Sequence, residues 1–194
     1  MRAWKTLTTF LGTLTQDSHG YGNNVQMSLD AKLKKECEEF LSRFRAILLS
    51  TLNADGTPDL SYAPFIDTES AFYILASHLS AHTGNLIRTP EASVLFIENE
   101  NECPEIYARR RLRFSCRAEL FTQQSAEWPE KIPLFRARFG EIIDTLSALP
   151  DFQLFSLTPV GGQWIKGFGK AFDFSGRIEG DAVHLNPKKS RQSD

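Results

Sequence analysis

The first segment with a clear hydrophobic period covers residues 28–44. Apolar residues recur there every three or four positions, with lysines and glutamates between them, which predicts an amphipathic helix lying over a core. Ser28 or Asp30 is the expected N-cap, because either side chain can accept a hydrogen bond from a free N–H of the first turn. The apolar positions are Leu29, Leu33, Cys37, Phe40, Leu41 and Phe44.

Short β patterns follow this helix. Asp55-Gly56 joins the first two as a hairpin, because a tight turn between strands needs residues that tolerate positive φ. Residues 78–88 have the pattern of a short helix, which Thr89-Pro90 closes. The strands predicted for this part of the chain are residues 46–52, 57–66, 71–77 and 92–98.

The most regular alternation covers residues 106–121. Apolar residues alternate there with polar ones, which predicts one long, half-buried strand with a basic outer face. A helical region over 125–149 and two closing strands over 152–160 and 163–174 complete the chain. Because the strands follow one another through hairpins and single inserted helices, we predict a mainly β (α+β) fold, an antiparallel β-barrel with peripheral helices.

Composition narrows the possible functions. A formal net charge of −2 gives no basic field, so we expect no binding to nucleic acid or to an anionic membrane surface. Cys37, Cys103 and Cys116 are an odd number without close spacing, which indicates the reducing cytoplasm rather than a disulfide framework. Threonines interrupt the apolar run at the N-terminus, so we predict neither a signal peptide nor a membrane span.

The chain length suits one domain with one core. Residues 15–27 are polar and rich in Gly and Asn, so residues 1–27 are predicted to be a loosely ordered extension. Met27 directly precedes the predicted helix, so the first 26 residues are either outside the fold or upstream of the natural start. We expect the domain to cover residues 28–185 and residues 186–194 to form a basic tail.

Several motifs together resemble a known superfamily. They are "SYAPF", "RFGEIID", "LPDF" and "KGFGKA", and the resemblance extends over roughly residues 28–185. On these motifs the chain resembles the FMN-binding split-barrel superfamily, whose fold is that of pyridoxamine 5'-phosphate oxidase, and is most similar to its haem-utilisation branch of the HugZ/HutZ type. The resemblance implies a six-stranded antiparallel split β-barrel, a homodimer, and a planar cofactor at the subunit interface.

The residues that grip FMN in the oxidase branch are absent from this chain. That branch holds the FMN phosphate with four cationic side chains, and the matching positions here are Ser61, Ile66, Ala81 and His82. Each charge-assisted hydrogen bond is worth about 1.5–3 kcal/mol, so losing four disfavours tight FMN binding in that manner. An arginine of the basic strand could compensate in part, and FMN stays the alternative cofactor.

The haem branch matches better, and haem is therefore the first-choice cofactor. Its characteristic residues correspond to His82 in the short helix, Arg111 in the basic strand and Asp151 in "DF". In that branch a histidine of the C-terminal tail binds the iron, and the Asp of the other subunit hydrogen-bonds that histidine. Ser77 and Asn85, from the same stretch as His82, complete the expected cofactor contacts.

The tail departs from the branch at the iron ligand. Lys189 stands where the histidine is expected, and a lysine would have to lose its proton to bind iron, which costs about 4–5 kcal/mol at neutral pH. His184 lies five residues upstream and is the predicted substitute ligand, with His82 as the second candidate.

Simpler explanations stand beside each of these assignments. His78 and His82, four residues apart, could be a zinc pair, part of a cofactor pocket, or polar packing. Asp151 could cap a turn, and the arginines of the basic strand could form a solvated face. The function predicted first is a haem-binding protein of haem iron utilisation, with degradation of haem by O₂ left open. The alternatives are an FMN-binding oxidoreductase of the same fold and a non-catalytic binding protein for a flat cofactor.

Overall fold

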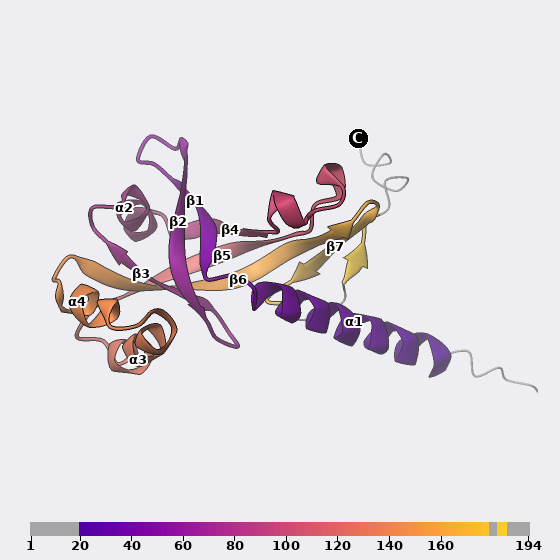
Figure 1. The fold of residues 1–194 in the computed structure, drawn as a ribbon, viewed down its shortest axis with the longest axis horizontal. Helices are drawn as coiled ribbons and strands as arrows, with labels where there is room; N and C mark the ends of the chain where they lie inside the picture. Colours follow the sequence, from indigo (N-terminus) through magenta and orange to yellow (C-terminus); the bar gives the residue numbers. More distant parts are fainter. Residues whose placement is uncertain (1–19, 179–181, 186–194) are drawn as a thin grey trace, which may run out of the picture.

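The computed structural model describes residues 20–178 and 182–185, with side chains from residue 31 onward. Six antiparallel strands close into a barrel (Figure 1). Their order is β3-β2-β1-β4-β5-β6, and β3 pairs with β6 to complete the ring. The strands are β1 (Ala46–Leu52), β2 (Pro58–Asp67), β3 (Phe72–Ser77), β4 (Glu91–Ile97), β5 (Arg111–Phe121) and β6 (Phe152–Gly167). The predicted six-stranded antiparallel barrel is confirmed.

Strand β6 belongs to two parts of the sheet. Its first half closes the barrel against β3, and its second half leaves the barrel to pair with β7 (Lys170–Ser175), which pairs with the two-residue β8 (Val183–His184). The predicted break between residues 160 and 163 is wrong, because Val160 forms a bulge in one continuous strand instead of a turn. Pro159 precedes it, and a proline without an N–H is tolerated at such an irregularity.

A cluster of phenylalanines fills the barrel. Phe65, Phe72, Phe96 and Phe114 are at most 1 % exposed, and their ring centroids lie 5.3–6.3 Å apart in the contacts they make. Edge-to-face packing at these distances adds to the free energy gained by burial. Cys116 also lies in this core. Burial raises the pKa of its thiol to about 12, so the thiol is unreactive and its role is packing.

Helix α1 (Gly20–Leu41) covers one end of the barrel (Figure 1). Leu33, Cys37, Phe40 and Leu41 pack into the core as the helical period predicts. The predicted N-cap is wrong, because Ser28 and Asp30 lie inside the helix. No proline interrupts residues 20–41, so the hydrogen-bond ladder continues through the polar segment. The extension was predicted over residues 1–27, and residues 20–27 of it belong to α1. Residues 1–19 and the basic tail lie outside the described residues.

The other helices lie at the opposite end of the barrel from α1 (Figure 1). They are α2 (Ala81–Arg88), α3 (Glu127–Phe139) and α4 (Ile142–Ala148). A second apolar cluster fixes α3 and α4 against the sheet through Phe135, Ile143, Leu154 and Ile66. No helix in the described part of the chain is long and apolar enough to cross a membrane.

The basic strand begins five residues later than predicted. Residues 106–108 form the 3₁₀ turn η2 (Ile106–Ala108), and β5 starts at Arg111. Glu98, which is 3 % exposed, fixes the chain just before β5. Its carboxylate accepts hydrogen bonds from the backbone N–H of Arg110 at 2.7 Å and from the Arg110 guanidinium at 2.9 Å. From Leu112 to Cys116 the predicted alternation is confirmed, with Leu112, Phe114 and Cys116 buried.

Candidate functional site

Helix α2 is held on the barrel by buried polar side chains. His82 and Asn85 are 6 % and 4 % exposed, so neither is open to a cofactor as the helix stands. The Nδ1 of His82 lies 3.0 Å from Ser61 Oγ. Asn85 donates to Thr51 Oγ1 at 3.0 Å and accepts from Arg88 at 2.7 Å. Burial lowers the pKa of His82, which favours the uncharged ring.

The positions matched to the FMN phosphate grip carry no positive charge. Ser61 and His82 are hydrogen-bonded to each other, Ile66 is buried in the second apolar cluster, and Ala81 has no polar group. His82 is held neutral and its Nδ1 is already occupied. The structure therefore offers a dianionic phosphate no cation at these four positions.

Asp151 and Ser77 contact each other just before the start of α2. The hydroxyl of Ser77 donates to Asp151 Oδ2 at 2.5 Å and accepts from the N–H of Leu79 at 3.0 Å. The N–H of His78 donates to the Asp151 carbonyl at 2.9 Å. These contacts fix the carboxylate, and among the described residues its Oδ1 has no hydrogen-bond partner. In Asp151, Oδ2 thus accepts a hydrogen bond that stabilises the fold, and Oδ1 is available to accept one from a ligand.

The zinc pair that the spacing of His78 and His82 allowed is not assembled. His78 is exposed, whereas His82 is buried and its Nδ1 is hydrogen-bonded to Ser61 Oγ. No group of three His, Cys, Asp or Glu side chains within the described ranges is placed to hold a metal ion. The structure favours polar packing for His82.

His184 lies exposed on β8, with its Nε2 3.0 Å from the carbonyl oxygen of Gly169. Because a carbonyl only accepts, Nε2 carries the hydrogen, and in the neutral ring Nδ1 carries the lone pair that a metal would take. The Phe172 ring packs against the imidazole at 5.0 Å. Binding through Nε2 would first break one hydrogen bond, which costs about 0.5–1.5 kcal/mol.

Arg111 begins β5 and is half-buried. Its Nη1 donates to the Arg109 carbonyl at 2.9 Å, and the rest of the guanidinium has no hydrogen bond to a described residue. In the strand register, Arg111 pairs with Ile165. The next residue, Leu112, starts a row of paired residues that crosses the sheet through Trp164 and Phe172 to His184. Since successive residues point to opposite faces, Arg111 and His184 lie on opposite faces of this sheet.

The six predicted cofactor residues divide between the two ends of β6. Ser77, His82, Asn85 and Asp151 lie at its beginning, and Arg111 and His184 lie beside its end. A strand of 16 residues at about 3.3 Å each spans roughly 50 Å. The two groups therefore do not form one site within a single subunit. Lys189 lies outside the described residues.

The outer face of the barrel presents a sheet surface that sequence reasoning missed. Leu60 and Tyr62 of β2 are 75 % and 65 % exposed, and Leu48 and Leu52 of β1 lie beside them. A row of small residues, Ser50, Ser93, Ser115 and Gly161, crosses the same face. The signal in the sequence was apolar residues at both alternating positions of residues 60–66, which indicates a strand covered on both faces.

Comparison with known proteins identifies the family. Residues 33–165 match the model of the pyridoxamine 5'-phosphate oxidase family. The chain is 41% identical over 160 residues to a protein named heme oxygenase HutZ from Vibrio cholerae, an alignment that covers 82% of this chain and 91% of that protein. The chain belongs to the pyridoxamine 5'-phosphate oxidase family, in its HutZ branch.

Solved structures of this family agree with the fold. A structure of V. cholerae HutZ, described as the heme storage protein, is similar with a TM-score of 0.63 and 37% identity over 73% of this chain and 93% of that one. Campylobacter jejuni ChuZ gives a TM-score of 0.72 and 32% identity over 81% of this chain and 65% of that one. The split barrel that the motifs implied is the fold of the HutZ branch.

Proposed function

We propose that this protein binds haem in haem iron utilisation, as a cytoplasmic homodimer of the HutZ type. The observation that carries this is 41% identity to HutZ over nearly the whole length of that protein. The hydrogen bond between Ser61 and His82 supports haem over FMN, because it occupies two of the positions that would have to hold the FMN phosphate.

The accessible residues fit haem. His184 offers an exposed imidazole whose Nδ1 is free, and Asp151 has one free carboxylate oxygen to accept from a ligand histidine. Arg111 has guanidinium N–H groups left for a propionate. Ser77 orients Asp151, whereas His82 and Asn85 act indirectly by holding α2 in place. We therefore assign iron ligation to His184, which requires β8 to move because His184 and Arg111 lie on opposite faces of the sheet.

The dimer follows from the distance between the two groups of residues. Because they lie at opposite ends of β6, one haem can touch both ends only if Asp151 comes from one subunit and Arg111 from the other. His184, on the opposite face of the sheet from Arg111, would reach that haem only after β8 and the tail are rearranged. A two-fold axis through the outer face would pair these ends twice, once at each end of the dimer. Leu60 and Tyr62 suit such a face because they offer exposed apolar surface to bury. The row of small residues beside them allows two sheets to approach closely.

Bound haem would supply the chemistry of O₂ activation, and iron release would follow opening of its ring. The chain would contribute the ligand, the hydrogen bond that tunes it, and the propionate contact. A second candidate function, haem storage without turnover, is favoured by the departure from the branch at Lys189 and by the description of the HutZ structure as a storage protein.

Reconstitution tests the cofactor. Purified protein is incubated in parallel with haem and with FMN, and the absorbance of the desalted protein is recorded. We expect a Soret band with haem and no retained flavin. Loss of that band with reductant and O₂, together with released iron, would indicate an oxygenase, and a persistent band would indicate storage. Retained FMN without a Soret band would contradict the proposal.

Variants test the site and the dimer. His184→Ala should abolish the ligated Soret spectrum and Asp151→Asn should weaken haem binding about tenfold, whereas the control His78→Ala should leave both unchanged. Tyr62→Arg should give monomers in sedimentation velocity and lose haem with them, and Leu134→Arg on α3 should do neither. A monomer that still binds haem would overturn the shared site.

A further inference from the structure

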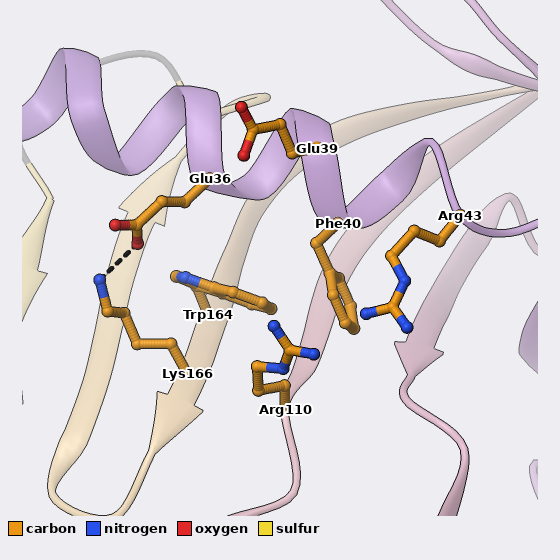
Figure 2. Close-up of a pocket in the computed structure, with 7 residues that line it drawn as sticks. All are labelled: Glu36, Glu39, Phe40, Arg43, Arg110, Trp164 and Lys166. Atoms are coloured by element: carbon orange, nitrogen blue, oxygen red, sulfur yellow. Dashed lines mark hydrogen bonds and ion pairs between the residues drawn. The ribbon is translucent and has the colours of Figure 1, made fainter. Parts of the chain in front are cut away.

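A cleft of about 400 Å³ separates the end of α1 from the second half of β6 (Figure 2). Its floor is aromatic, with the rings of Phe40 and Trp164 4.7 Å apart. The guanidinium of Arg110 lies 5.9 Å from the Phe40 ring. The lining residues are Glu36, Glu39, Phe40, Arg43, Arg110, Trp164 and Lys166. None of the residues assigned to haem is among them.

The indole of Trp164 carries an unused donor in this cleft. The residue is 2 % exposed, and its Nε1 is buried without a hydrogen-bond partner among the described residues. Figure 2 shows the nitrogen end of the indole directed toward the side where Lys166 and Glu36 meet. An indole N–H can only donate, and a buried donor without an acceptor is rare in folded proteins.

The cations of the cleft also have unused donors. Among the described residues, Lys166 pairs with Glu36 alone, Arg43 uses one terminal nitrogen on Glu102, and Arg110 uses Nε and Nη2 on Glu98. Nη1 of Arg110 donates to no described residue. Each of the three cations is thus paired with one carboxylate and keeps N–H groups that donate to no described residue. These N–H groups and the indole N–H of Trp164 lack acceptors, so a ligand that completes them must bring acceptors.

We propose that this cleft binds a small organic anion through a carboxylate or a phosphate group. The indole N–H of Trp164 and the ammonium of Lys166 donate to the anion, and Arg43 closes the opposite wall. The aromatic floor accommodates the body of the ligand. This site is separate from the haem residues, so it does not depend on the proposed function.

The test uses the full chain without haem and the indole N–H signals in two-dimensional NMR. Sodium succinate and sodium phosphate are titrated separately, with sodium chloride at matched ionic strength as the control. The Trp164 signal, identified by its loss in Trp164→Phe, should shift to saturation with one of the two anions and stay in place with chloride. The signal of Trp128 should stay in place throughout. A response to succinate alone assigns a carboxylate ligand, and a response to phosphate alone assigns a phosphate ligand.

Variants separate this site from a general salt effect. Lys166→Met and Arg43→Gln should each weaken binding about tenfold, because each removes a charged donor. The matched control Lys170→Met, on the other strand of the same hairpin and outside the lining of the cleft, should bind as the wild type does. The proposal is overturned if chloride gives the same shift, if neither anion saturates, or if both cleft variants bind unchanged.

Discussion

The two ends of β6 differ in how their polar groups are satisfied. At the α2 end, His82 and Asn85 are buried and engaged with Ser61, Thr51 and Arg88. At the β8 end, Nδ1 of His184, Nη1 of Arg110 and Nε1 of Trp164 have no partner among the described residues. Polar groups that are already paired stabilise the fold. Unpaired groups are those with which a ligand gains the most binding free energy by forming a hydrogen bond. Asp151 is the exception at the α2 end, and its free oxygen is why we place it in the haem site.

The largest effect expected from this contrast is on stability. Asn85→Ala removes three hydrogen bonds at once and leaves Thr51, Asn53 and Arg88 without them. We expect a loss of about 2–3 kcal/mol in the free energy of unfolding, measured by urea denaturation. His184→Ala, an exposed residue at the other end, should change it by less than about 0.5 kcal/mol. Equal losses in the two variants would remove the contrast.

A smaller loss is expected at Glu98, which fixes the start of β5 from a buried position. Arg110 hydrogen bonds hold the pKa of Glu98 below its usual range, so this contribution to stability is present at neutral pH and is lost as pH falls through the folded-state pKa. Glu98→Gln should lower the free energy of unfolding by about 1–2 kcal/mol at pH 7. The difference between variant and wild type should shrink in acid, and a difference that is constant from pH 7 to pH 3 would contradict the assignment.

The smallest effect is a pH dependence at the α2 end. Burial lowers the pKa of His82 in the folded state, so the unfolded chain binds a proton first as pH falls through about 6.5. Stability conferred by the neutral ring is therefore lost on acidification, by at most about 1.4 kcal/mol per pH unit. Urea denaturation at pH 7.5, 6.5 and 5.5 measures how the free energy of unfolding changes with pH. This change should be smaller in the His82→Gln variant. An identical slope in the variant would show that other groups cause it.

Sequence patterns identified most of the barrel because alternation reports burial directly. Leu112, Phe114 and Cys116 alternate with arginines, and the structure buries those three. The break predicted near Val160 was wrong because a proline and two glycines so close together, at positions 159, 161 and 162, are typical of a turn and of a bulge alike. The start of α1 was wrong because its first residues show no apolar period.

The candidate site was predictable in its parts and not in its arrangement. Motif matching selected Asp151 and Arg111, but it could not show that His82 and Asn85 face the barrel, because a helix of eight residues has too few positions to reveal which side is covered. Nor could it place Arg111 and His184 on opposite faces, since that depends on the register of four strands. Trp164 carried no signal, because an indole without a partner is visible only in three dimensions.

The bulge at Val160 has an evolutionary consequence. Before it, Pro159 points toward the core, and after it, Gly162 and Trp164 do, so one extra residue sets the phase of the second half of β6. If Val160 were paired as a regular strand residue instead of forming a bulge, Trp164 would face outward and Gln163 inward. The Asn53–Gly56 turn can gain or lose residues without such an effect. Insertions and deletions among relatives should therefore collect in that turn and be absent from the regularly paired parts of β6, where a change of one residue exchanges the two faces of the sheet.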